Sequence, residues 1–128
     1  MHRNATMTAA TAFDYTVRVA GILALLLGLA LWGGRLYGLI NLHMALGVVV
    51  VLGLWGLAVL SLRRRGSSRL AIGAAVWGLT TLALGPSQTG LLVGDLHWLV
   101  QVAHLLLGLG AIALGAVLAK ALRTRESD

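Results

Sequence analysis

Four long apolar runs constrain the fold of this chain more than any other feature. They cover about residues 16–33, 37–62, 69–84 and 96–121, and short polar segments separate them. A helix of ~20 apolar residues crosses the ~30 Å hydrocarbon core of a bilayer, and the third run lies at the lower limit of ~17 residues. Strands of a transmembrane barrel would instead alternate apolar and polar residues. The sequence therefore predicts one all-α domain over residues 1–128, a four-helix transmembrane bundle with flexible tails at 1–14 and 123–128.

The basic residues predict how this bundle is oriented. The segment 63–69 holds four arginines, and Lys120, Arg123 and Arg125 lie in the C-terminal segment after Leu118. Positively charged loops stay in the cytoplasm, so we expect this segment and both termini to be cytoplasmic, in a bacterial cytoplasmic (inner) membrane. The net charge of +6 is explained by these segments, which lack interleaved aromatic residues and do not indicate nucleic-acid binding.

The composition excludes several classes of function. The chain has no cysteine, which rules out disulfides, thiolate-bound iron–sulfur clusters and covalent haem attachment. Its acidic residues lie near or beyond the expected membrane ends, whereas a proton pump or ion-coupled carrier would need a carboxylate inside the membrane. No serine, histidine and acid constellation is present. The acidic residues are Asp14, Asp95, Glu126 and Asp128.

Histidines interrupt two of the apolar runs. The stretch 95–116, DLHWLVQVAHLLLGLGAIALGA, carries His97, Gln101 and His104, and LINLHMALGVVVVLGLW carries His43. Ionisable side chains at membrane depth are costly without a partner or a task. At about 100° per residue, His97, Gln101 and His104 share one helix face, which should face protein and not lipid. The sequence therefore predicts that the second and fourth helices meet through their histidines.

A weak internal repeat supports this pairing. His43 and His104 each begin an HxxxG motif, which ends at Gly47 and Gly108. Two helical hairpins repeated in parallel would bring equivalent histidines face to face, at depths that differ by only ~3 Å. Glycine one turn from each histidine would leave room for a flat macrocycle, although glycine also serves close helix packing. We therefore predict bis-histidine ligation of a non-covalent haem b by His43 and His104.

Three further residues are candidates for the same site. His97 is an alternative metal ligand on the fourth helix, a hydrogen-bond donor to haem propionates, or an interfacial histidine without a ligand. Gln101 could contact a propionate, a ligand nitrogen or a quinone, or make a plain interhelical hydrogen bond. Arg35, the one cation in the outer connections, could neutralise a propionate or simply face water.

Two segments resemble a known family. The run RLAIGAAVWGLTTLALGPSQTGLLVGDLHWLVQVAHLLLGLGAIAL resembles the third and fourth helices of one four-helix half of the heme A synthase family, and LINLHMALGVVVVLGLW resembles the second. The resemblance implies His43 and His104 as axial haem ligands. That family has a glutamate just before its catalytic histidine, and residues 39–42 here contain none, which argues against heme A synthesis. A looser similarity to small di-histidine cytochromes of the b561 type implies membrane electron transfer.

The sequence thus predicts a small integral membrane b-type cytochrome for transmembrane or periplasmic-side electron transfer, and it favours an electron carrier over a catalyst. Histidine at both axial positions disfavours gas binding. The partners that the sequence predicts are the lipid bilayer, a quinone or a redox-partner membrane complex, and a second copy of the chain. The main alternative is a haem-free accessory subunit that packs as a scaffold in a larger membrane complex. A transporter and a haem-modifying enzyme are further alternatives.

Overall fold

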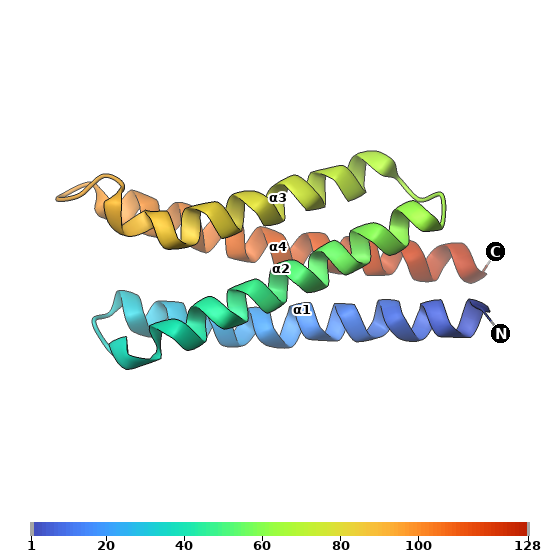
Figure 1. Cartoon of the computed structure of the whole chain (residues 1–128), viewed down its shortest axis with the longest axis horizontal. Helices are drawn as coiled ribbons and strands as arrows, with labels where there is room; N and C mark the ends of the chain where they lie inside the picture. Colours follow the sequence, from blue (N-terminus) through green and yellow to red (C-terminus); the bar gives the residue numbers. More distant parts are fainter. Residues whose placement is uncertain (1, 128) are drawn as a thin grey trace.

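The chain forms four long helices that lie side by side (Figure 1). The computed structural model describes residues 2–127. Its long helices are α1 (His2–Trp32), α2 (Ile40–Arg63), α3 (Ser68–Ser87) and α4 (His97–Ser127). Short 3₁₀ turns, η1 (Tyr37–Leu39) and η2 (Gln88–Gly90), lie in the first and third connections. The all-α, four-helix prediction is confirmed, and no strand occurs in residues 2–127.

The outer ends of the first and last helices differ from the prediction. The sequence predicted tails at 1–14 and 123–128. Helix α1 instead begins at His2, and α4 continues to Ser127. The reason is tertiary packing, since Ala10 joins the buried core and Asp14 pairs with Arg123 of α4. Long-range contacts of this kind extend helices beyond their apolar runs.

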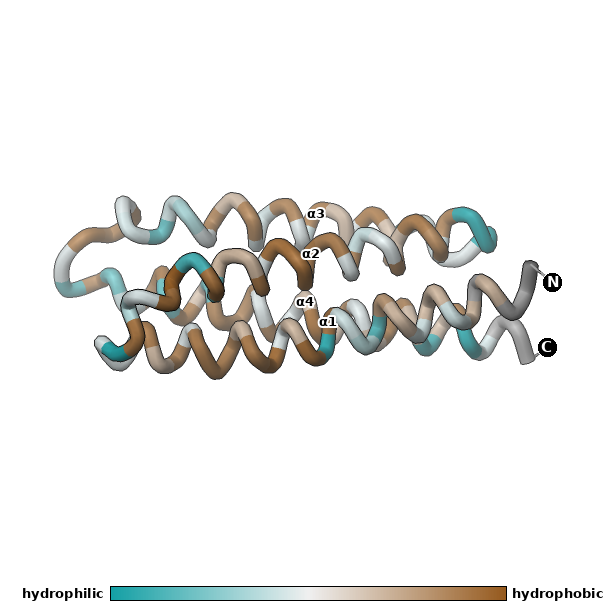
Figure 2. The backbone as a smooth tube through the Cα atoms, turned by 60° about the horizontal axis from the view of Figure 1, so that its bottom comes forward, coloured by the Kyte–Doolittle hydropathy of each residue, from teal (hydrophilic) through white to brown (hydrophobic). Residues whose placement is uncertain are grey.

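All four helices are suited to cross a membrane. The candidate spans are Met7–Trp32, Tyr37–Arg63, Ser68–Gly90 and His97–Thr124, each long and apolar enough. The third span, which seemed short in the sequence, gains length because its helix continues through Pro86 to Ser87. Figure 2 shows apolar residues along the middle of the helices and more polar ones towards their ends. The chain is therefore a multi-pass membrane protein.

The helices pack so that α2 and α4 occupy the centre. Helix α1 packs on α2 and α4, α3 also packs on α2 and α4, and α2 and α4 contact each other. Both ends of the chain lie at the same end of the bundle (Figure 1). We call this the terminal end, and the end with the first and third connections the loop end. The α2–α4 contact brings together the two helices that carry His43 and His104.

The buried core is confined to the half nearer the terminal end. Its largest fully buried side chains are Val17, Val51, Leu54, Leu57 and Leu118. By contrast, no residue in 22–49, 79–99 or 101–110 is buried, and only Val100 interrupts this pattern. Among the described residues, the loop-end half therefore contributes only Val100 to the buried side chains.

Candidate functional site

His43 and His104 lie together in the loop-end half of the bundle. Their ring centres are 6.1 Å apart and the ring planes are inclined by 65°. His43 comes from the first turn of α2 and His104 from the third turn of α4, and both side chains are half-buried. The two histidines that the sequence paired by their depth are thus neighbours in space.

This separation suits two imidazoles that share one metal ion. A five-membered ring with bonds of about 1.35 Å places each atom about 1.15 Å from the ring centre. With metal–nitrogen bonds of about 2.0 Å, as in zinc–imidazole sites, two rings on opposite sides of a metal have centres about 6.3 Å apart. The observed 6.1 Å is close to that value. The distance between the ring centres is therefore compatible with one metal ion between the two rings.

The His43 ring is held in place by α1. Its Nδ1 lies 3.0 Å from the carbonyl oxygen of Ala24. A carbonyl oxygen only accepts hydrogen bonds, so Nδ1 carries the proton and donates it. The same ring lies against Gly28, where an added Cβ would be 3.0 Å from Cε1 of His43. This arrangement leaves the lone pair on Nε2 available, the tautomer that a metal-binding histidine uses.

The His104 ring is held less firmly. It lies against Gly85 of α3, where an added Cβ would be 3.5 Å from Cε1, an ordinary contact. Its Nδ1 is buried and has no hydrogen-bond partner. A buried polar atom without a hydrogen-bond partner typically costs about 1–3 kcal/mol of stability. The hydrogen bond to Ala24 avoids this cost at His43. The two histidines thus differ in how their rings are supported.

Gly47 and Gly108, each one turn beyond a histidine, do not serve helix packing. A Cβ at Gly47 would meet no atom within 4 Å, and one at Gly108 would meet only Leu25 Cδ2 at 3.8 Å. Elsewhere glycines do permit close approach, since a Cβ at Gly53 would lie 2.7 Å from Val17 and one at Gly78 would lie 2.7 Å from Trp55. The space beside Gly47 and Gly108 is therefore open, as a flat ligand would require.

The other predicted site residues lie on α4 and in the first connection. His97 begins α4, and its Nδ1 lies 3.1 Å from the carbonyl oxygen of Leu91 in the third connection. Gln101 is half-buried one turn further along α4. Arg35 is exposed in the first connection. The ring that lies next to His43 is that of His104 and not of His97.

The residues that support the rings carry no signal in the sequence. Gly28 and Gly85 are two of 17 glycines, and nothing in the sequence around them distinguishes them from the others. The Ala24 contact uses a main-chain carbonyl, which any residue type supplies. Only the three-dimensional packing of α1 on α2 and of α3 on α4 identifies these contacts.

A second polar cluster lies nearer the terminal end. Asp14 accepts hydrogen bonds from Arg18 Nε at 2.8 Å and from Arg123 Nη1 at 3.1 Å. Asp14 is only 7% exposed, although the sequence placed it in a flexible tail outside the membrane. It lies inside the span Met7–Trp32, and its charge is matched by arginines on α1 and α4. This ion triad joins the first and last helices.

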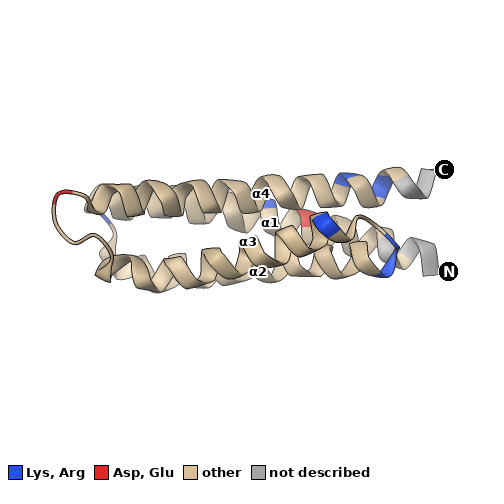
Figure 3. Ribbon diagram, turned by 90° about the horizontal axis from the view of Figure 1, so that it is seen from above, with Lys and Arg blue, Asp and Glu red and all other residues tan. Residues whose placement is uncertain are grey.

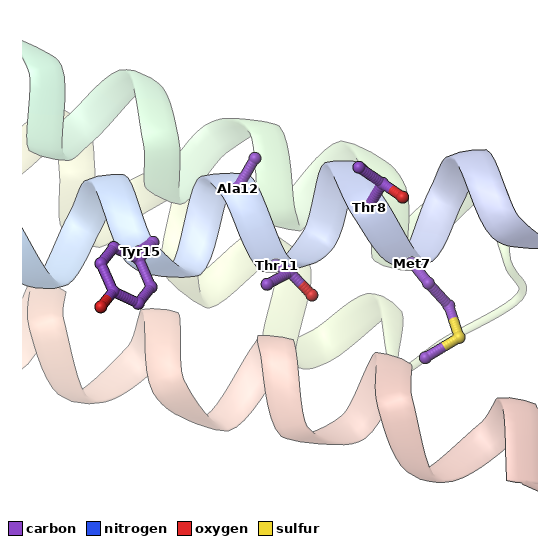
Figure 4. Close-up of a pocket in the computed structure, with 5 residues that line it drawn as sticks. All are labelled: Met7, Thr8, Thr11, Ala12 and Tyr15. Carbon is purple, nitrogen blue, oxygen red and sulfur yellow. The ribbon is translucent and has the colours of Figure 1, made fainter.

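Two hollows in the surface are lined by residues other than the histidines. One is formed entirely by side chains of α1, from Met7 to Tyr15, as Figure 4 shows. It is an open depression on one helix, with the hydroxyl groups of Thr8, Thr11 and Tyr15 among its lining. The second, of about 380 Å³, lies between the end of α3, the third connection and α4. It is lined by Leu84, Leu91, Leu92, Leu99, Val100 and Ala103.

Comparison of the chain with models of protein families, with curated proteins and with solved structures gives no match. The functional argument therefore rests on the geometry of the site.

Proposed function

We propose that this protein binds one non-covalent haem b between α2 and α4, with His43 and His104 as axial ligands, and carries electrons in the membrane. The observation that carries the proposal is the 6.1 Å separation of the two rings, together with the His43 ring held in its ligating tautomer. The resemblance to one half of the heme A synthase family points to the same two residues.

The ligand set favours a macrocycle over a bare metal ion. Within the described residues, no group of three or more His, Cys, Asp or Glu side chains could hold a metal. Two imidazoles alone leave most positions of a metal ion unfilled, whereas a porphyrin supplies four nitrogen ligands of its own. The pair His43 and His104 is complete only if the ligand brings the remaining donors.

The shape of the loop-end half also supports the proposal. Its helices contribute no buried residue except Val100, and the positions of Gly47 and Gly108 are open. Apolar side chains dominate this region, including Leu25 beside Gly108. A flat apolar ring beside these positions would gain van der Waals contacts with apolar side chains, which is the interaction that drives packing inside a membrane.

The protein's own residues would set the properties of the bound group. Haem supplies one-electron chemistry when bound. Ala24 fixes the orientation of the His43 ring and raises its basicity through the Nδ1 hydrogen bond. The terminal end, where Figure 3 shows most lysines and arginines, would face the cytoplasm. A quinone or a redox-partner membrane complex would then exchange electrons at the loop end.

The first test is a visible spectrum of the protein purified in mild detergent, reduced with dithionite and compared with the air-oxidised sample. We expect the sharp α-band of a six-coordinate low-spin haem b, typed by pyridine haemochrome extraction. His43→Ala and His104→Ala should each lose this band, and His97→Ala should keep it as the matched control. A preparation that stays colourless after haem is supplied would refute the proposal and leave the haem-free accessory subunit in its place.

A second test separates a haem site from a helix contact. Gly47→Leu fills open space beside His43, so we expect a folded protein with strongly reduced haem content. Gly73→Leu is the matched control, because a Cβ at Gly73 also meets no atom within 4 Å but lies on the exposed side of α3. Equal haem content in both variants would contradict the proposed position of the ring.

A further inference from the structure

The ion triad of Asp14, Arg18 and Arg123 buries its anion and exposes its two cations. Arg18 Nε donates to one carboxylate oxygen of Asp14 at 2.8 Å, and Arg123 Nη1 donates to the other at 3.1 Å. Only 10% of the Asp14 side chain is exposed, against 49% of the Arg18 side chain and 37% of the Arg123 side chain. One buried carboxylate thus holds two guanidinium groups, from α1 and from α4, close together at the surface of the bundle.

The exposed side of the triad is complementary to a phosphate group. A guanidinium carries five N–H groups in a planar fork, and the hydrogen bond to Asp14 uses one of them on each arginine. Within the triad, two guanidinium groups and one carboxylate give a net positive charge. Arginine forks match the geometry of phosphate oxygens and can donate two parallel hydrogen bonds to them. The remaining N–H groups of Arg18 and Arg123 therefore suit an anionic phosphate.

The surroundings of the triad are those of a membrane interface. Lys120 is exposed on α4, three residues before Arg123, and residues at this spacing are neighbours on a helix surface. On α1, Tyr15 is 70% exposed three residues before Arg18. Tyrosine is enriched at the headgroup level of membranes. Most lysines and arginines gather at the same end of the bundle (Figure 3), and such a concentration of positive charge attracts anionic lipids.

An apolar stripe leads from the triad along the outside of α1. Ile22, Leu26 and Leu29, which we call the α1 stripe, are 53%, 61% and 50% exposed. At about 100° per residue, all three lie within about 80° of Arg18 around the helix axis. Leu29 lies about 16 Å from Arg18 along the axis, roughly half of a ~30 Å hydrocarbon core. The α1 stripe thus has the length and direction of an acyl chain in the leaflet at the terminal end.

We propose that Arg18 and Arg123 bind the headgroup phosphate of an anionic phospholipid, and that one acyl chain of this lipid lies on the α1 stripe. Lys120 adds to the positive charge beside the headgroup. Asp14 positions the two guanidinium groups from the interior side, and the phosphate joins the same two groups from the outer side. The site involves neither histidine and is independent of the proposed haem site.

The test is native mass spectrometry of the full-length protein in a mild non-ionic detergent. Phosphatidylglycerol is the anionic probe, and phosphatidylcholine with the same acyl chains, at the same concentration, is the zwitterionic one. Each basic residue in contact with an anionic lipid contributes about fivefold in affinity, so the first phosphatidylglycerol should bind about tenfold or more tightly than phosphatidylcholine. Equal binding of the two lipids to the unmodified protein would overturn the proposal without the need for any variant.

Charge-matched variants separate a site from general attraction. Arg18→Gln should weaken phosphatidylglycerol binding about fivefold. Arg69→Gln is the control, because it removes the same charge from an exposed position at the start of α3, and it should bind like the unmodified protein. Arg18→Lys keeps the charge but not the planar fork, and it should lose most of what Arg18→Gln loses. Equal losses in Arg18→Gln and Arg69→Gln, or full binding by Arg18→Lys, would show attraction by total charge alone and overturn the site.

Inorganic phosphate distinguishes a lipid site from a site for a free ion. Sodium phosphate should displace no more phosphatidylglycerol than sodium chloride of the same ionic strength, because the ion lacks the acyl chain that lies on the α1 stripe. Selective displacement by phosphate would overturn the assignment to a lipid. The haem proposal is tested separately, since a colourless protein can still show the lipid preference and a coloured protein can lack it.

Discussion

Substitution of Gly110 by alanine should loosen the contact between α3 and α4. Trp77 of α3 lies flat against Gly110, and a Cβ at that position would overlap the indole ring, lying 2.6 Å from Cε2 and 2.8 Å from Nε1. The indole Nε1 also donates a hydrogen bond of 2.8 Å to the carbonyl oxygen of Leu107. An added methyl group therefore has to displace the ring and break this bond.

The expected cost follows from three effects. Overpacking of a close contact costs about 1–3 kcal/mol. Loss of a hydrogen bond between membrane helices adds about 0.6 kcal/mol. Alanine regains up to about 1 kcal/mol relative to glycine in a helix. With the full alanine gain, the net destabilisation should be about 0.6–2.6 kcal/mol. Helix α3 buries only Ala71, Ala74 and Gly78, so it has few other contacts to compensate for a displaced Trp77.

The measurement is unfolding by sodium dodecyl sulfate in mild-detergent micelles, followed by circular dichroism. Gly110→Ala should unfold at a clearly lower fraction of the denaturing detergent. Gly73→Ala makes the same chemical change where a Cβ meets no atom within 4 Å, and it should unfold at or slightly above the original midpoint. Coincident midpoints for the two variants would refute the close packing of Trp77 on Gly110.

Two further predictions concern contacts made by α1. Gly28→Ala should push the His43 ring away from α1 and lower haem affinity several-fold, measured by titrating haem into the apoprotein. Gly85→Ala should have a smaller effect, because an added Cβ would lie 3.5 Å from the His104 ring and not 3.0 Å, as at Gly28 and His43. Equal effects of the two substitutions would contradict this geometry. Asp14→Asn should lower the unfolding midpoint, because it removes the carboxylate shared by the ion triad. The double variant Asp14→Asn with Arg123→Gln should lose less stability than the sum of the losses in the two single variants. Strict additivity would show that the Asp14–Arg123 pair makes no net contribution to stability.

The sequence predicted the number of helices because crossing a bilayer requires a minimum length of apolar residues. It did not predict where α1 begins or α4 ends. Those limits depend on Ala10 in the buried core and on the Asp14–Arg123 pair, whose members are 109 positions apart in the chain. A contact of that range leaves no periodic pattern, so hydropathy alone ended both helices too early.

The site was predictable to a similar degree. His43 and His104 could be paired because ionisable side chains in apolar helices need partners, and the topology places them at similar depth. The unequal support of the two rings could not be predicted. It depends on the main-chain carbonyl of Ala24 and on the distances at Gly28 and Gly85, and these arise only from the way α1 and α3 pack on the central helices.

The orientation in the membrane decides which side of the cell exchanges electrons with the site, and it can be tested cleanly because the chain has no cysteine of its own. The carbonyl of Ala24 lies ten residues beyond Asp14 along α1, or about 15 Å at 1.5 Å per residue. If the ion triad lies at the cytoplasmic interface, His43 is thus about halfway across a ~30 Å core.

Single cysteines report which end of the bundle is outside. Ser67→Cys, in the basic connection at the terminal end, should resist a membrane-impermeant maleimide applied to intact cells and react once the cells are opened. Thr89→Cys, exposed at the loop end, should react in intact cells. The reverse pattern would mean that the arginines of residues 63–69 do not set the topology. The loop end would then face the cytoplasm, and the electron donors and acceptors of this site would have to be sought there.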